Sequence, residues 1–335
     1  MDAVVFPAAG RIEVSSVPDP KCGREEVVVR VARAGLCGTD IHIHRNEYLS
    51  PFPLIPGHEF AGEVVEIGAD VRHLQVGDRV AVDPNIDCLA CEFCRRQQNN
   101  HCSNWAGIGI TRPGAFAQFV AAPARVAYKL PETIDDAQAA FIEPVSCVVH
   151  AMNRLPFSAG DTVLLFGAGP IGLVLMQMLK LRGASTLVVV DRQPHRLALA
   201  SQLGATHALL ADESLDEALK TIAPAGFAIV ADATGVPAVI QRAFDYLRPC
   251  GAYLQFGVSP KDKTIALSPF RIFKHDWTII GTFALRYTFE PAIALLASRA
   301  IDIAPLISDV LPLQQFEQGF TAFEKGQSLK VQFTP

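Results

Sequence analysis

Four cysteines lie within fifteen residues of this 335-residue chain, in the runs CLACEFC and NNHCSN. Cys88, Cys91 and Cys94 are three residues apart and Cys102 follows eight residues later, so one short loop can bring the four sulfur atoms together. Four thiolates at this spacing predict a tetrahedral Zn²⁺ site of the structural type, which is closed and leaves no position for a substrate. Disulfides are the alternative, but the chain lacks the cysteine framework of a small secreted domain.

A second group of possible metal ligands lies upstream of these cysteines. The segment RAGLCGTDIHIH contains Cys37, and the segment LIPGHEFAGEVVEIG contains His58 and Glu59. Cysteine, histidine and a carboxylate form the mixed ligand set of a catalytic zinc, which keeps one coordination position open. Because neighbouring residues on a regular strand point to opposite faces, His58 and Glu59 reach one metal only where the backbone is irregular.

A glycine-rich turn lies in the middle of the chain. The run GAGPIG directly follows the apolar run TVLLF, opens a segment with helical periodicity, and precedes an acidic residue at the end of TLVVV. This context predicts a βαβ unit that binds a dinucleotide, with the pyrophosphate at the helix N-terminus. The residues expected at the cofactor are Gly167, Gly169, Pro170, Ile171, Gly172, Asp191, Arg192, Arg196 and Asp232.

The choice between NAD and NADP depends on Asp191, the acidic residue that ends TLVVV. A carboxylate there accepts hydrogen bonds from both ribose hydroxyls and repels a 2′-phosphate, so we expect NAD. Arg192 and Arg196 are the two residues that could instead pair with a 2′-phosphate.

The motifs GHEFAGEVVEIG and VGDRV, together with the four-cysteine segment, resemble the zinc-dependent medium-chain dehydrogenase/reductase family. The resemblance runs along the whole chain. It implies that Cys37 and His58 bind the catalytic zinc, that the four cysteines bind a structural zinc, and that Arg196 covers the adenine. Two zinc ions per chain are therefore expected.

The third protein ligand of the catalytic zinc differs between branches of this family. The Glu-Pro of FIEPVSC resembles the polyol, or sorbitol dehydrogenase-like, branch, in which a carboxylate replaces a cysteine. Both Glu59 and Glu143 are therefore expected at the metal, and the choice of third ligand stays open between them. The alternative role of Glu143 is to cap a helix. Cys147 lies four residues too late to be a ligand, so we expect it to pack within a helix.

The family resemblance also implies a path for the proton released by an alcohol. A Ser or Thr at the position of Thr39 passes it, through the nicotinamide ribose, to a histidine that matches His42. His44 is the rival for the second role. A histidine titrates in the pH range that such a relay needs.

The substrate class is implied by the segment GTFALRYTFEPAIALL. Arg286 and Tyr287 match residues with which sorbitol dehydrogenase-like enzymes bind polyol hydroxyls, and a guanidinium with a phenol offers several hydrogen bonds. Two features depart from that pattern. The aromatic residue that the family has shortly after the relay is Ile43 here, and the segment after Tyr287 is one residue shorter.

Two domains are expected from the length and from the order of these motifs. Alternating strand and helix patterns predict an α/β fold with a doubly wound parallel Rossmann sheet over residues 145–283. The resemblance implies a β-rich, GroES-like catalytic domain over 1–144, with the zinc lobe at 88–102. It also implies that 284–335 returns to this domain and that the active site lies in the cleft between the domains.

Composition excludes several classes of partner. The net charge is −5, and no cluster of Lys and Arg marks a surface for nucleic acid or an anionic membrane. The N-terminus lacks the pattern of a signal peptide, and the longest apolar run is too short to span a membrane. A cytoplasmic protein is expected, and the family resemblance implies a homodimer or homotetramer.

These observations predict a zinc-dependent, NAD(H)-linked oxidoreductase that interconverts a polyol and its keto sugar by hydride transfer. The alternative substrates are another secondary alcohol, a vicinal diol or L-threonine. A non-catalytic zinc scaffold is the alternative from a different class, and it would leave the dinucleotide motif without a role.

Overall fold

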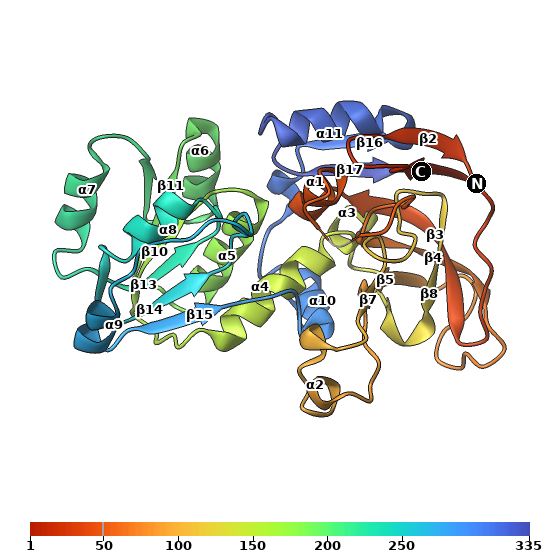
Figure 1. Cartoon of the computed structure of the whole chain (residues 1–335), viewed down its shortest axis with the longest axis horizontal. Helices are drawn as coiled ribbons and strands as arrows, with labels where there is room; N and C mark the ends of the chain where they lie inside the picture. Colours follow the sequence, from red (N-terminus) through yellow and green to blue (C-terminus); the bar gives the residue numbers. More distant parts are fainter. Residues whose placement is uncertain (49) are drawn as a thin grey trace. The chain divides into compact units, whose positions relative to one another are not determined.

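The computed structural model describes residues 1–48 and 50–335. The chain forms two compact units (Figure 1). Unit 1 contains Met1–Ser146 and Leu285–Pro335, and unit 2 contains Cys147–Ala284. Helix α4 (Ile142–Arg154) includes the division between them.

Unit 2 contains a six-stranded parallel sheet with the strand order β12-β11-β10-β13-β14-β15. This order, in which the chain starts in the middle and extends first to one edge and then to the other, is that of a dinucleotide-binding fold. The strands are β10 (Thr162–Phe166), β11 (Thr186–Asp191), β12 (His207–Leu210), β13 (Phe227–Asp232), β14 (Leu247–Gln255) and β15 (Thr278–Gly281). The helices are α5 (Pro170–Leu181), α6 (Pro194–Leu203), α7 (Leu215–Ile222), α8 (Pro237–Ala243) and α9 (Pro269–His275).

The local sequence explains the centre of this sheet. Strands β10, β11 and β13 are continuous apolar runs, as expected of parallel strands buried on both faces. Helix α5 is buried from Gly172 to Leu179 and is apolar around its whole circumference, which is typical of a central helix. Pro170 begins α5, where the missing N–H costs little.

Unit 1 is built on a seven-stranded sheet with the order β16-β17-β3-β4-β5-β9, in which β8 also pairs with β3. Two further antiparallel pairs, β1 with β2 and β6 with β7, form separate two-stranded sheets. The strands are β1 (Asp2–Val5), β2 (Glu13–Ser16), β3 (Glu26–Gly35), β4 (Glu59–Ile67), β5 (Arg79–Val82), β6 (Asn85–Ile86), β7 (Ala106–Gly107), β8 (Phe119–Pro123), β9 (Ala127–Lys129), β16 (Asp309–Pro312) and β17 (Val331–Thr334).

The helices of unit 1 are short and lie between these strands. Besides the first turn of α4 they are α1 (Gly38–His44), α2 (Glu92–Arg95), α3 (Asp136–Ala139), α10 (Phe289–Ala297) and α11 (Phe316–Glu324), with 3-10 turns at 99–101, 124–126, 304–306 and 313–315. Within the described ranges, every helix is too short or too polar to cross a lipid bilayer.

Strand β3 is central to unit 1 because it pairs with β4, β8 and β17. The C-terminal strand β17 runs antiparallel to β3, with Gln332 opposite Gly35. The final residues of the chain therefore lie beside the segment that precedes Cys37. The predicted α/β fold class is confirmed by these two sheets.

Asp83 is a buried carboxyl group in the interior of unit 1. Its Oδ1 accepts hydrogen bonds from the backbone N–H and the side-chain amide of Asn85, both at 2.9 Å. Burial raises the pKa of Asp83 from 3.8 to about 6. The bonds from Asn85 and the charge of Arg125 oppose this rise, whereas the nearby Asp87 adds to it.

Replacement of Asp83 by Asn should remove a pH dependence of stability. A raised pKa means that Asp83 stabilises the fold below its unfolded value of 3.8 and that this contribution is lost as pH rises through about 6. The two pKa values differ by an amount that corresponds to on the order of 3 kcal/mol. The free energy of unfolding of Asp83→Asn, relative to that of wild type, should therefore rise by up to ~3 kcal/mol between acidic and neutral pH.

Urea unfolding of both proteins over this pH range measures the difference. Glu13→Gln, which removes an exposed carboxylate on β2, is the matched control and should show no such gain. A constant difference between wild type and Asp83→Asn at all pH values would show that Asp83 does not titrate in this window.

Candidate active site

Cys37, His58 and Glu59 converge on one point in unit 1. Each offers one ligand atom, and these atoms all lie within 4.8 Å of one another. Cys37 is the N-cap residue of α1, and Glu59 is the first residue of β4. His58 therefore precedes the regular strand, which is why these two adjacent residues can face the same point.

Asp40 supports this cluster, and the sequence analysis did not identify it. Its side chain is fully buried, and its Oδ2 accepts a hydrogen bond of 2.9 Å from the Cys37 N–H. Its Oδ1 lies 3.5 Å from Nδ1 of His58. A carboxylate on one ring nitrogen of a histidine fixes the ring and leaves the other nitrogen for a metal. The only signal in the sequence was an acidic residue three positions after the helix N-cap.

The charges around His58 favour a cation. Burial by itself disfavours protonation of the ring, but the negative charges of Asp40 and Cys37 outweigh burial and hold the pKa of His58 well above 6.5. The site therefore attracts positive charge.

Lys330, near the start of β17, is the second supporting residue that the sequence analysis missed. Its ammonium donates to Glu59 Oε2 and, at 2.9 Å, to the carbonyl oxygen of Leu36. Both side chains of the ion pair are buried, with 4% and 2% of their surfaces exposed. The two residues are 271 positions apart, so no local pattern in the sequence could indicate the pair.

The formal charges fit a divalent cation. With His58 neutral, as a metal ligand must be, the carboxylates of Asp40 and Glu59 and the thiolate of Cys37 would give −3, and the ammonium of Lys330 would bring the sum to −2. A sulfur, a nitrogen and an oxygen donor are also the ligand set that zinc accepts. The residues present therefore fit a catalytic zinc.

Glu143 lies in the first turn of α4 and is partly buried. In the part of the chain that the structure describes, the mixed-ligand group contains Cys37, His58 and Glu59 but not Glu143. This geometry favours Glu59 as the carboxylate of the cluster. A role for Glu143 at the metal stays a prediction.

The proposed relay residues lie in different surroundings. The hydroxyl of Thr39 is 3.7 Å from the Cys37 sulfur, which places it at the cluster. His42 is partly exposed, and its Nδ1 lies 2.6 Å from Oε2 of Glu47. His44 instead packs edge-on against Phe6 and Phe320, and burial lowers its pKa. Both histidines are partly exposed, and a role for either in proton transfer stays a prediction.

Arg286 and Tyr287 contact the cysteine segment. The guanidinium of Arg286 donates to the carbonyl oxygen of Gln97, and the hydroxyl of Tyr287 lies 3.4 Å from Oδ2 of Asp87. These contacts do not involve Cys37 or His58, and substrate binding by Arg286 and Tyr287 stays a prediction.

The four remaining candidate ligands also converge. The sulfur atoms of Cys88, Cys91, Cys94 and Cys102 lie within 4.8 Å of one another. The Cys91 and Cys94 sulfurs are 3.4 Å apart, and the Cys88–Cys94 and Cys91–Cys102 pairs are both 4.0 Å apart. A tetrahedral zinc with bonds of ~2.3 Å would place its sulfur ligands about 3.8 Å apart. All four cysteines are free thiols, so the lobe fits a closed structural zinc and does not form disulfides.

Backbone N–H groups surround the lobe. The Cys88 N–H lies 3.3 Å from the sulfur of Cys102, and the Cys91 N–H lies 3.4 Å from that of Cys88. Hydrogen bonds from Cys94 and Ser103 lower the pKa of Cys91 to about 6. Burial raises the pKa of Cys94 to about 12, so a cation at the centre is needed to hold all four as thiolates.

The glycine loop of unit 2 joins the end of β10 to α5. Gly167 has a φ of +101°, and a Cβ at Gly172 would lie 2.0 Å from the Gly167 carbonyl oxygen, so the turn requires both glycines. A Cβ at Gly169 would meet no atom within 4 Å. The open space at Gly169, at the N-terminus of α5, fits a pyrophosphate group.

Asp191 is the last residue of β11 and is hydrogen-bonded to the glycine loop. Its Oδ2 accepts a hydrogen bond of 2.7 Å from the Ala168 N–H, and its Oδ1 accepts one of 2.9 Å from Gln193. Arg192 is exposed beside it, and Arg196 is partly buried in α6. Ile171 follows Pro170 in the first turn of α5.

Asp232 is fully buried at the end of β13. Its oxygens accept hydrogen bonds from Thr234, from the Gly235 N–H at 2.8 Å and from the Gln255 amide at 3.2 Å. Asp232 therefore stabilises the loop after β13 by accepting these hydrogen bonds. A direct contact between Asp232 and the cofactor stays a prediction.

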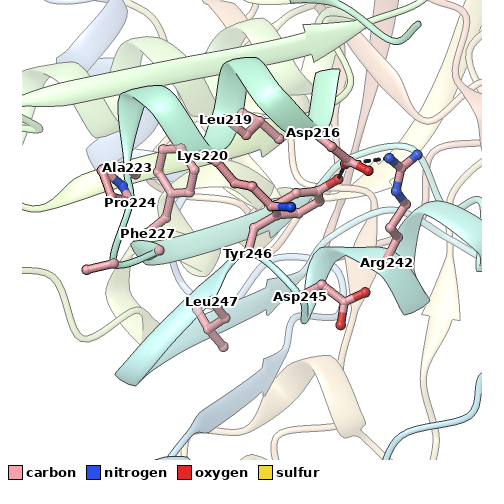
Figure 2. A pocket seen from close by; sticks show the side chains of 12 residues that line it. Asp216, Leu219, Lys220, Ala223, Pro224, Phe227, Arg242, Asp245, Tyr246 and Leu247 are labelled. Carbon is pink, nitrogen blue, oxygen red and sulfur yellow. Dashed lines mark hydrogen bonds and ion pairs between the residues drawn. The ribbon is translucent and has the colours of Figure 1, made fainter. Parts of the chain in front are cut away.

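A hollow of about 410 Å³ lies at the other end of the sheet (Figure 2). Phe227 and Leu247 line it, and they begin the parallel strands β13 and β14, so it is opposite to the glycine loop. Asp216 in its wall accepts hydrogen bonds from Arg242 and from Tyr246, as Figure 2 shows. These polar groups satisfy one another and indicate no ligand.

Two family models match this chain. The alcohol dehydrogenase GroES-like domain matches residues 23–132, and the zinc-binding dehydrogenase domain matches residues 170–298. D-arabinitol dehydrogenase 1 of Uromyces fabae is 32% identical over 340 residues, which cover 100% of this chain and 97% of that protein. The chain belongs to the zinc-dependent medium-chain dehydrogenase/reductase family. The predicted family and enzyme class, that of a dehydrogenase, are thereby confirmed.

Two further similar proteins bear on substrate and cofactor. L-threonine 3-dehydrogenase of Cronobacter sakazakii is 34% identical over 334 residues, covering 97% of this chain and 96% of that protein. A zinc-binding dehydrogenase of Sinorhizobium meliloti 1021, solved bound to NADP, superposes with a TM-score of 0.95 at 32% identity, covering 100% of this chain and 99% of that one.

Proposed function

We propose that this dehydrogenase interconverts a polyol and its keto sugar, using NAD(H) and one catalytic zinc, and that a second zinc stabilises the cysteine lobe. The observation that carries the proposal is the convergence of Cys37, His58 and Glu59, whose ligand atoms lie within 4.8 Å of one another beside the buried side chains of Asp40 and Lys330. When bound, zinc would acidify a substrate hydroxyl, and the nicotinamide would accept the hydride.

The chain's own residues would manage the proton. Thr39 Oγ1, beside the metal cluster, can accept a proton and donate its own. His42 is the group that would pass the proton to solvent, because it is partly exposed and its Nδ1 is held by Glu47. Asp40 and Lys330 would keep His58 and Glu59 in place.

NAD is the cofactor that Asp191 supports. Its carboxylate is fixed by two backbone N–H groups and would repel a 2′-phosphate. Arg192, which is exposed next to it, keeps NADP as the alternative, and the similar S. meliloti protein was solved with NADP.

A polyol is the proposed substrate class because a similar protein of matching length is a D-arabinitol dehydrogenase. L-threonine is the second candidate, since a relative of comparable identity is an L-threonine 3-dehydrogenase.

The eight free cysteines fit a reducing compartment, which supports a cytoplasmic location.

Absorbance at 340 nm tests substrate and cofactor together. The purified protein should reduce NAD with at least one of arabinitol, sorbitol, xylitol or galactitol, and faster than it reduces NADP. A faster reaction with L-threonine or with 2,3-butanediol would overturn the polyol assignment. Activity with NADP alone would overturn the role given to Asp191.

The two proposed metal sites should respond differently to loss of a cysteine. Cys37→Ser should retain one zinc per chain and lose activity, and its unfolding midpoint should fall less than that of Cys91→Ser, because the lobe is intact. Cys91→Ser should lower the unfolding midpoint by at least about 5 °C, or roughly 2 kcal/mol for a domain of this size.

Elemental analysis and thermal unfolding of the two variants measure these effects. Equal losses of stability would contradict the division into a catalytic and a structural site. A wild-type protein with a single zinc, held by the lobe, would favour the non-catalytic scaffold.

We also propose that the protein is a homodimer or homotetramer that assembles through β15. This strand lies at one edge of the sheet of unit 2 and exposes Ile279. The preceding helix α9 exposes Phe270 and Phe273, the latter to 82%. An unpaired strand edge beside exposed apolar side chains favours pairing with a second copy about a two-fold axis.

Ile279→Lys should therefore reduce the mass in solution, as measured by light scattering after gel filtration. Leu210→Lys is the matched control, because Leu210 is an exposed apolar residue on β12, the other edge strand. A monomeric wild type, or an equal effect of the two variants, would argue against assembly through β15.

A further inference from the structure

Lys330 is held in one position by three groups. Its ammonium donates to Glu59 Oε2 and to the Leu36 carbonyl oxygen, and it lies 5.4 Å from the centre of the Phe141 ring. The side chain is 4% exposed, so water does not replace these partners. A buried ammonium with fixed partners holds its carboxylate firmly, because separating the pair would leave an uncompensated buried charge.

Glu59 is shared between this ammonium and the metal cluster. One of its oxygens, Oε2, accepts the bond from Lys330, while the carboxylate also lies within reach of Cys37 and His58. Without Lys330, the carboxylate would be free to offer both oxygens to a metal.

Gly35 provides the space for this pair. A Cβ at Gly35 would lie 2.3 Å from Glu59 Oε2 and 3.1 Å from Cε of Lys330. Strand β3 thus leaves a gap in which the carboxylate and the ammonium meet, and the pairing of β3 with β17 brings Lys330 into it. The ion pair of Lys330 and Glu59 therefore lies directly against the backbone of β3 at Gly35.

We propose that Lys330 is a positioning residue for the reaction: by holding one oxygen of Glu59, it leaves a single oxygen for the metal and keeps a coordination position available to the substrate. This inference rests on the proposed catalytic zinc. A purely structural Lys330 would only join β17 to the rest of unit 1, and its loss would change stability without changing the metal's ligands.

Cobalt substitution distinguishes these two roles. The visible absorption of Co²⁺ weakens as its coordination number rises, and the difference between wild type and Cys37→Ser isolates the catalytic site. In Lys330→Met the released carboxylate should weaken this difference spectrum and tighten Co²⁺ binding at least tenfold. kcat should fall in the zinc-loaded form, because the substrate position is filled.

Three further variants complete the test. Lys330→Arg keeps the cation and should restore the wild-type spectrum. Lys330→Met in a Glu59→Gln background should produce no further change, because the oxygen that Lys330 holds is already lost as a charged ligand. Lys129→Met breaks another ion pair of unit 1, with Asp78, and should leave the spectrum unchanged.

The possible failures can be told apart. Absence of a Cys37-dependent cobalt spectrum in the wild type would overturn the proposed metal centre itself. If the wild type shows this spectrum and Lys330→Met changes neither its intensity nor the affinity for Co²⁺, only the role given to Lys330 would be overturned. If Lys330→Met does not fold, Lys330→Gln takes its place under the same expectations.

Discussion

The excess of buried negative charge in unit 1 is the constraint on which its proposed metal site depends. Asp40 and Glu59 are carboxylates with almost no exposed surface, and both lie beside Cys37. Lys330 compensates part of this charge, and a divalent cation would compensate the rest. Burial of charge without compensation is costly, and Asp40 Oδ1 and His58 Nδ1 are buried atoms that lie 3.5 Å apart without a hydrogen bond.

The backbone of unit 1 is arranged so that distant segments supply this cluster. Helix α1 presents Cys37 and Asp40 one turn apart, and the start of β4 presents His58 and Glu59. The pairing of β3 with β17 then adds Lys330 from the end of the chain. A residue that supports the site is thus supplied by a segment 271 positions away from Glu59 in the sequence.

The cysteines that could bind metal in unit 1 form two groups with different surroundings. The lobe offers four sulfur atoms with backbone N–H donors around them, an arrangement suited to a closed, stabilising site. The other cluster offers one sulfur, one nitrogen and one oxygen, the mixed donor set typical of zinc sites that keep a coordination position open. The glycine loop of unit 2 depends instead on backbone atoms. No side chain fits at Gly172, because a Cβ there would lie 2.0 Å from the Gly167 carbonyl oxygen.

The sequence by itself indicated the four-cysteine lobe and the glycine loop, because each depends on residue types at short, fixed spacings. It indicated the family and the α/β fold class through motifs along the whole chain, and Cys37, His58 and Glu59 through the family resemblance. Only the tertiary structure revealed Asp40 and Lys330 as partners of His58 and Glu59, and showed His42 beside Glu47 and His44 against two phenylalanines. It also showed Asp232 engaged in internal hydrogen bonds and Arg286 at the cysteine lobe. Partner choice and burial depend on which distant strands and helices meet, and the spacing of residues along the chain does not contain that information.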